Sequence, residues 1–129
     1  MALEFTTTAL IPASCNVIYA AWIDSEGHAG MTGAPARCSA SVDGSFEAWG
    51  GYITGTNLVL TENQQIVQSW RTADFEDDEA DSRLEITLEP QGNATRVRIH
   101  HSDLPAHGMQ YLQGWKEHYF TPMIAHFSA

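Results

Sequence analysis

Apolar and polar residues alternate along much of the second half of the chain. A period of two sends successive side chains to opposite faces of a β-strand. The clearest examples are residues 83–90 and 95–101, in which Arg, Glu, Thr and His separate the apolar positions. Weaker runs of the same type lie in residues 36–42, 45–51, 52–60 and 64–72. Because short turn sequences separate these runs, we predict an antiparallel meander with one apolar and one wet face.

The N-terminal third predicts a strand followed by two short helices. Residues 3–10 alternate as a strand should, and Pro12 ends the alternation. Ser14 can cap a helix over residues 13–23, and Asp24 or Ser25 can cap one further helical turn. Gly30, Gly33 and Pro35 then predict a loop before the meander begins.

The C-terminal segment reads as one long helix, from about Leu104-Pro105 to Phe127. At 100° per residue one arc of this helix is apolar. Its members are Met109, Leu112, Trp115, Tyr119, Phe120, Met123, Ile124 and Phe127. Pro122 has no amide for the carbonyl of His118, so we expect a kink. A bent helix with such bulky aromatics either lines an enclosed space over the sheet or packs into a solid core, and both interpretations stay open.

Histidines are dense around this helix but do not form a metal site. His107 and His118 share an azimuth, yet three turns separate them by ~16 Å, and we expect both to face outward or the rim. No two histidines have the i, i+4 spacing of a zinc-binding helix. We expect neither a metal nor a cofactor.

Length, charge and cysteine content narrow the class of protein. A chain of 129 residues fits one domain, residues 1–129. The net charge of −10 disfavours nucleic acid and anionic membranes as partners. Cys15 and Cys38 lack the spacing of a zinc or disulfide framework, and no stretch approaches the ~18 apolar residues of a membrane span. We therefore expect a cytoplasmic protein without membrane insertion.

An acidic run of six carboxylates lies between Asp74 and Asp81. It lacks the spaced ligands and closing Glu of a calcium-binding loop. We interpret it as a solvated connection between two strands.

Several segments together resemble a known superfamily. They are "IPASCNVIYAAWIDSEGHAGMTGAPA", "IVQSWRT", "SRLEITLEPQGNATRVRIHHSDLP" and "GWKEHYFTPM". In this order they resemble the START-like superfamily, also called SRPBCC. Within it they resemble the branch named for the C-terminal domain of the activator of the ninety-kilodalton heat-shock protein ATPase. The resemblance implies an α+β helix-grip fold, in which a seven-stranded antiparallel sheet wraps around a long C-terminal helix, with two short helices between the first two strands.

The resemblance also implies a cavity between helix and sheet that holds a small hydrophobic or amphipathic molecule. Candidate lining residues are Trp22, Met31, Trp49, Tyr52, Gln68, Trp70, Ile86, Ile99, His101, Leu112, Trp115, Tyr119 and Met123. Trp22 and Met31 are expected at one mouth of the cavity. His101 and Gln68 are either polar groups that orient a ligand or buried core residues with internal hydrogen bonds.

Two other functions stay open at this point. One is a cyclase or hydrolase that uses His101 as general base and Tyr52 or Tyr119 as proton donor. The other is a chaperone-accessory or protein-interaction role, with the acidic run of residues 74–81 docking on a basic partner. A homodimer through a sheet edge or the helix surface is compatible with either.

Overall fold

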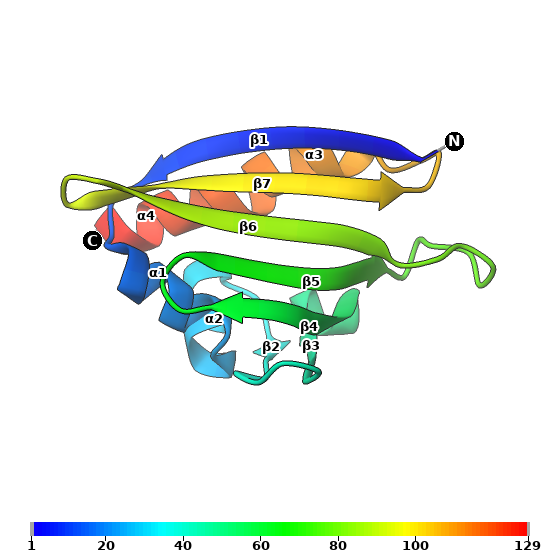
Figure 1. Cartoon of the computed structure of the whole chain (residues 1–129), viewed down its shortest axis with the longest axis horizontal. Coiled ribbons are helices and arrows are strands. Elements are labelled where there is room, and N and C mark those ends of the chain that lie inside the picture. The colour runs from blue at the N-terminus through cyan, green and yellow to red at the C-terminus, as the bar shows by residue number, and fades with distance from the viewer. Residues whose placement is uncertain (1, 129) are drawn as a thin grey trace.

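Seven strands form one antiparallel sheet in the computed structural model, which describes residues 2–128 (Figure 1). The sheet order is β1-β7-β6-β5-β4-β3-β2. The strands are β1 (Leu3–Ile11), β2 (Ala36–Arg37), β3 (Ser45–Ala48), β4 (Ile53–Thr61), β5 (Gln65–Thr72), β6 (Ser82–Gln91) and β7 (Ala94–Leu104). The helical elements are α1 (Cys15–Trp22), α2 (Ser25–Thr32), the short turn η1 (Trp49–Gly51), α3 (Gln110–Gly114), the π-helix η2 (Trp115–Phe120) and α4 (Thr121–Ser128).

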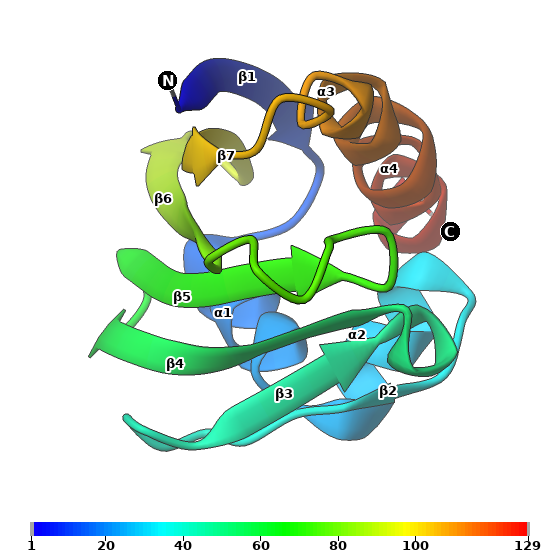
Figure 2. The same ribbon diagram turned by 90° about the vertical axis from the view of Figure 1, so that its right-hand side faces the viewer.

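The sheet curves around the C-terminal helical segment formed by α3, η2 and α4. Seen from the end, the strands bend into a partly open ring, and this segment lies across the open side (Figure 2). The helices α1 and α2 come between β1 and β2 in the chain. This is the helix-grip fold, and the prediction of fold class is confirmed.

The alternating pattern sets the register of the central strands. In the antiparallel pair of β6 and β7, Leu84 lies opposite His101 and Ile86 lies opposite Ile99. These four side chains are almost completely buried, whereas their neighbours along each strand are at least partly exposed. The period of two therefore identified the inner face of the sheet correctly.

Local capping explains how α2 begins and ends. The Asp24 carboxylate accepts a hydrogen bond from the Gly27 amide at 2.8 Å, as an N-cap should. Gly33 ends the helix with a φ of 82°, the left-handed conformation that glycine adopts most easily. The expected loop at Gly30 is wrong, because α2 continues through that residue to Thr32.

The Gly27 position also lets α1 and α2 approach closely. A β-carbon there would lie 2.7 Å from the Ala21 Cα, a separation that forces the backbone to move. Glycine is thus required at Gly27 for space.

The C-terminal helix begins later than the sequence pattern indicated. Strand β7 continues to Leu104, residues 105–109 form turns, and the helix starts at Gln110. Met109 therefore precedes the helix, and neither Met109 nor Ile124 is part of the core, with exposed fractions of 46% and 40%. Within residues 2–128 no helix is both long and apolar enough to cross a membrane.

The expected irregularity at Pro122 takes the form of a π-helical turn. Pro122 lies in the first turn of α4, where its missing amide is tolerated. The preceding residues 115–120 widen into η2, and the Thr121 hydroxyl donates to the Lys116 carbonyl at 2.9 Å, five residues back. Single π-turns inside helices are frequent at functional sites.

Two strand predictions are shortened by turns. Strand β2 covers two residues instead of seven, and β3 stops at Ala48. After β3 the backbone turns at η1, where Trp49, Gly50 and Gly51 have φ values of 55°, 67° and 93°. The Gly-Gly pair permits this turn, and it places the indole of Trp49 beside the helix.

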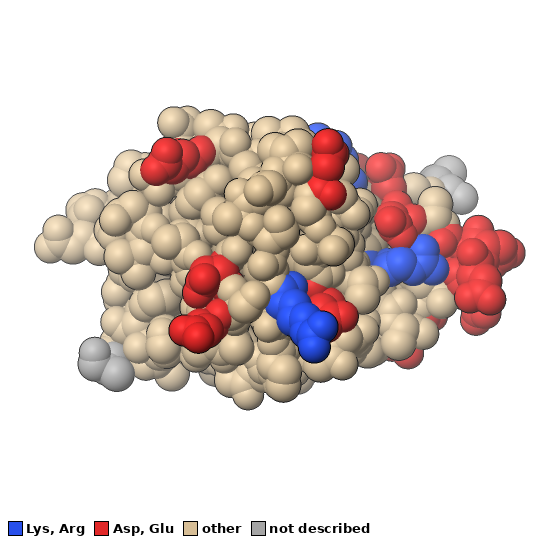
Figure 3. All heavy atoms as spheres, turned by 90° about the horizontal axis from the view of Figure 1, so that it is seen from below, with Lys and Arg blue, Asp and Glu red and all other residues tan. Residues whose placement is uncertain are grey.

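The acidic run extends from the sheet as the β5–β6 connection. Its six carboxylates gather at one end of the molecule, next to scattered basic residues (Figure 3). The guanidinium of Arg71 fixes this loop by donating to the Glu79 carbonyl at 3.1 Å and the Asp81 carboxylate at 2.8 Å. Phe75, in the middle of the run, is buried. The loop is thus solvated at its carboxylates, as expected, but fixed to the protein by one arginine and one aromatic ring.

Candidate ligand pocket

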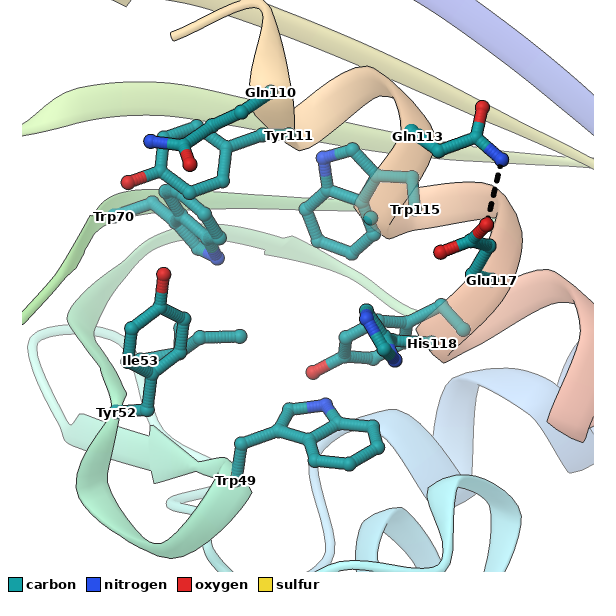
Figure 4. Close-up of a pocket in the computed structure, with 12 residues that line it drawn as sticks. Trp49, Tyr52, Ile53, Trp70, Gln110, Tyr111, Gln113, Trp115, Glu117 and His118 are labelled. Carbon is teal, nitrogen blue, oxygen red and sulfur yellow. Dashed lines mark hydrogen bonds between the residues drawn. The ribbon is translucent and has the colours of Figure 1, made fainter. Parts of the chain in front are cut away.

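A pocket of about 530 Å³ opens between the C-terminal helical segment and the β4–β5 side of the sheet (Figure 4). This volume lies within the range of sites that hold small organic molecules. Its lining residues come from η1, β4, β5 and three successive helical turns. They are Trp49, Tyr52, Ile53, Trp70, Gln110, Tyr111, Gln113, Gly114, Trp115, Glu117, His118 and Tyr119.

Aromatic rings form most of the wall. Trp70 from β5 packs against Tyr111 from α3, with ring centroids 4.8 Å apart and planes at 80°. Trp115 and Tyr119 lie 4.7 Å apart on the helix. These edge-on and tilted contacts hold the rings at fixed angles, because such pairs have preferred geometries. The wall is therefore apolar, and it presents both faces and edges of aromatic rings.

Trp49 occupies an unusual position at the opposite wall. A bulky residue with φ near 55° is a backbone outlier, and such conformations cost about 1–3 kcal/mol. Its ring contacts the exposed imidazole of His118 edge-on, at a centroid distance of 5.3 Å. Its indole nitrogen points into the pocket (Figure 4) and is shielded from solvent, with no hydrogen-bond partner among residues 2–128. Strain and an unpaired donor thus coincide at one residue of the lining.

A polar chain closes the other end of the pocket. The Tyr52 hydroxyl donates to the Asp74 carboxylate at 2.5 Å, and the hydroxyls of Thr72 and Tyr111 are 2.6 Å apart. Burial, followed by the hydrogen bond to Asp74, raises the pKa of Tyr52. Burial likewise raises the pKa of Tyr111 to about 12. Both phenols therefore stay protonated at neutral pH and serve as neutral hydrogen-bonding groups.

Behind the wall, Tyr119 is fixed by a buried histidine. The His28 Nδ1–H donates to the Trp22 carbonyl at 2.8 Å, which leaves Nε2 to accept from the Tyr119 hydroxyl at 2.7 Å. Burial lowers the pKa of His28 and raises the pKa of Tyr119. Both groups are neutral, and the pair orients the Tyr119 ring at the pocket.

His101 belongs to a second internal network. The indole N–H of Trp115 donates to His101 Nδ1 at 3.1 Å, so the proton of the neutral ring is on Nε2. That Nε2–H donates to the Ser82 hydroxyl at 2.8 Å, and Ser82 donates in turn to the Trp70 carbonyl at 2.8 Å. Burial, and secondarily the charge of His100, lowers the pKa of His101 to about 3. The network orients the indole of Trp115 and fixes the backbone of β5 at Trp70.

These contacts argue against His101 as a general base. Its side chain has no exposed surface, it is not among the pocket-lining residues, and both ring nitrogens are occupied. An imidazole with a pKa of about 3 is also a weak proton acceptor at neutral pH.

Charge at the pocket is acidic. Glu117 lines the rim, where its carboxylate accepts a hydrogen bond from Gln113 at 2.9 Å (Figure 4). The carboxylate of Asp74 reaches the same pocket through the Tyr52 hydroxyl. Among the described lining residues there is no Lys or Arg.

The pocket brings together five of the thirteen residues named from the sequence. These are Trp49, Tyr52, Trp70, Trp115 and Tyr119. The other eight lie outside the lining. Trp22, Met31, Gln68, Ile86, Ile99, His101 and Met123 are buried in the core, and Leu112 is half-buried on the helix. Trp22 and Met31 therefore support the interior and do not form a mouth. As ligand contacts, all thirteen stay predictions.

Gln68 has an internal hydrogen-bond partner, as expected if it is a buried core residue. Its amide nitrogen donates to the Asn57 carbonyl oxygen at 3.0 Å, and Asn57 in turn donates to the Ser39 carbonyl at 2.7 Å. The carbonyl oxygen of the Gln68 side chain is buried without a partner among the described residues.

Seven lining residues were not among the candidates, and most come from the helix. They are Ile53, Gln110, Tyr111, Gln113, Gly114, Glu117 and His118. His118 is exposed and lines the pocket, in agreement with the expected position facing outward or the rim. The apolar arc leaves out Tyr111 because it includes Met109, which precedes the helix and shifts the arc away from Tyr111. The signal that could have found it is the i, i+4 series of aromatics Tyr111, Trp115 and Tyr119.

The fold and sequence both have known relatives. An HSP90 activator from Plasmodium falciparum superposes with a TM-score of 0.82 at 20% identity, over 92% of this chain and 91% of that one. Protein MLL2253 from Mesorhizobium loti gives a TM-score of 0.82 at 16% identity, over 98% and 97% of the two chains. An uncharacterized protein of Schizosaccharomyces pombe is 27% identical over 112 residues, which are 87% of this chain. The match spans about a third (33%) of the length of that curated relative.

At these identities the structural likenesses establish the fold alone. Family membership comes from the sequence itself. Residues 12–127 match the family model described as Activator of Hsp90 ATPase homolog 1-like protein, which covers most of the chain. The protein is a START-like domain and belongs to the family of Activator of Hsp90 ATPase homolog 1-like proteins.

Proposed function

We propose that this protein binds a small apolar or amphipathic molecule in the pocket between its C-terminal helical segment and its sheet. The observation that carries the proposal is the pocket of about 530 Å³, in which six of the twelve lining residues are Trp or Tyr. A pocket of this size with a few polar groups is the usual form of a small-molecule site. In this proposal residues 1–129 act as one domain, in the cytoplasm.

Hydrogen bonding inside the wall supports binding more than packing alone would. Trp115 and Tyr119 are positioned by hydrogen bonds to the two buried histidines, and the Trp70 ring packs edge-on against His101 at a centroid distance of 4.5 Å. A wall whose rings are fixed before the ligand arrives loses little conformational freedom on binding, which favours affinity.

The experiment uses a variant that fills the pocket from the helix. Gly114 lines the pocket, and a β-carbon there would meet its nearest neighbour, the His118 ring, only at 4.0 Å. Gly114→Leu therefore occupies the pocket without a backbone clash, and it should also favour the helix. Gly30→Leu is the matched control, since Gly30 lies in α2 outside the pocket lining and its β-carbon would lie 3.7 Å from His126.

The measurement is a thermal-shift and native mass spectrometry screen of apolar and amphipathic compounds against the three proteins. We expect hits that raise the melting temperature of the wild type and of Gly30→Leu but leave Gly114→Leu unchanged. Hits that stabilise Gly114→Leu equally would place binding elsewhere. An absence of any hit from a chemically broad screen would contradict the proposal.

A further inference from the structure

The pocket contains a hydrogen-bond donor that the protein itself does not use. The Nε1–H of Trp49 is shielded from solvent and has no acceptor within residues 2–128. The Tyr119 hydroxyl donates its own proton to His28. Burial raises the pKa of Tyr119 and the approach of the Trp49 indole lowers it in part, but this approach does not have the geometry of a hydrogen bond. A buried donor left without a partner is costly, so such a group commonly marks the position of a missing acceptor.

The backbone holds this donor in place. Trp49 has a φ of 55° between β3 and β4, and its ring packs edge-on against His118. Strained conformations persist where the surrounding structure fixes them, and they cluster at ligand sites. The Trp49 indole is therefore held in one orientation, and its N–H does not rotate freely as it would on an exposed side chain.

The shape of the pocket restricts the ligand further. The rings of Trp70 and Tyr111 meet at 80°, and those of Trp115 and Tyr119 along the helix meet at 49°, so the apolar wall presents both ring faces and ring edges. Flat conjugated molecules fill such a space with the offset or edge-on contacts that aromatic rings prefer.

Charge excludes one class of ligand. Glu117 lines the rim and Asp74 is bonded to the Tyr52 hydroxyl, whereas the described lining contains no Lys or Arg. The whole chain also carries a net charge of −10. A carboxylate or phosphate in the pocket would lose its hydration and gain no cationic partner.

From these observations we propose that the pocket selects a flat, uncharged molecule whose carbonyl or similar acceptor oxygen receives the Trp49 Nε1–H, and that it rejects anionic analogues. This inference rests on the proposed function, because it names the chemical class of the ligand for the same site.

The test uses three naphthalene probes of similar size. Acetonaphthone has the acceptor, ethylnaphthalene lacks it, and naphthoate has a negative charge. Their affinities are measured by quenching of tryptophan fluorescence in a buffer of about pH 8, in which an ordinary imidazole is uncharged. The variant Trp49→Phe keeps a flat ring but removes the N–H. Glu117→Gln removes the charge at the rim.

We expect the wild type to bind acetonaphthone about 3- to 10-fold more tightly than ethylnaphthalene, the contribution of one hydrogen bond. In Trp49→Phe this preference should disappear. Naphthoate should bind most weakly, and Glu117→Gln should improve its affinity about 2- to 5-fold relative to acetonaphthone.

Other results separate the inference from the proposed function. Equal affinities for acetonaphthone and ethylnaphthalene in the wild type, or tightest binding of naphthoate, would overturn the inference while leaving pocket binding intact. Equal losses for both neutral probes in Trp49→Phe would do the same. If no probe binds the wild type at all, the proposed function fails together with the inference. If Trp49→Phe does not fold, the order of the three probe affinities for the wild type still tests the inference.

Discussion

Acidification should destabilise this protein well before its carboxylates are protonated, because His101 is buried in the neutral form. Its folded-state pKa is about 3, whereas an unfolded histidine titrates near 6.5. Below about pH 6.5, His101 therefore binds a proton in the unfolded chain but not in the folded protein. The stability is fully present above the unfolded pKa and is lost progressively as the pH falls toward the folded pKa.

The magnitude follows from these two values. Between about pH 7 and pH 5 the difference in proton binding at His101 removes about 2 kcal/mol from the free energy of unfolding. The lowered pKa of His28 adds to the loss in the same direction. Such a change is a large part of the stability of a typical domain.

Urea denaturation at several pH values measures this loss. The variant His101→Gln, which cannot titrate, should show a smaller loss over the same range. Nitrogen chemical shifts provide a second measurement, since His101 should keep its single proton on Nε2 down to about pH 5, and burial lowers the pKa of His28, whose proton is on Nδ1. A stability that does not change between pH 7 and pH 5, or a His101 ring that titrates near 6.5, would refute the reasoning.

Two further changes test the contacts around the helices. Tyr119→Phe should lower the free energy of unfolding by about 1–3 kcal/mol, because Nε2 of the buried His28 loses its donor; a loss within experimental error would mean that this hydrogen bond is absent. Two helical glycines should respond oppositely to alanine. Gly27→Ala should destabilise by about 1–3 kcal/mol through its contact with Ala21, and Gly114→Ala should stabilise by up to about 1 kcal/mol; thermal melts that give both changes the same sign would contradict the packing described.

The sheet was predictable from sequence because a buried face leaves a direct trace in the pattern. In the middle of β6 and β7 every second residue is apolar, over residues 84–88 and 97–99, and the next inward residue, His101, is buried with both nitrogens bonded. Residues 74–81 were equally readable, since a dense run of carboxylates has to remain near water.

Element ends and the pocket were less predictable, for particular reasons. Pro105 fits the first turn of a helix as well as the end of a strand, so the sequence did not decide where the C-terminal helix begins. The turn at Trp49 depends on a left-handed tryptophan, which local propensity disfavours and tertiary structure imposes. A pocket is also an absence of packing, and an apolar stripe does not distinguish side chains that line a space from side chains that fill it.

The most direct test of the central claim uses the four tryptophan indole N–H signals in a nitrogen–proton correlation spectrum. Acetonaphthone is titrated into the labelled wild type. Occupation of the pocket should shift the Trp49 signal most, because its donor is unpaired, and the Trp115 signal less, because its donor is held by His101. Binding in the pocket predicts that these shifts saturate and that Gly114→Leu abolishes them. Saturating shifts confined to the acidic loop, or none at Trp49, would contradict the account.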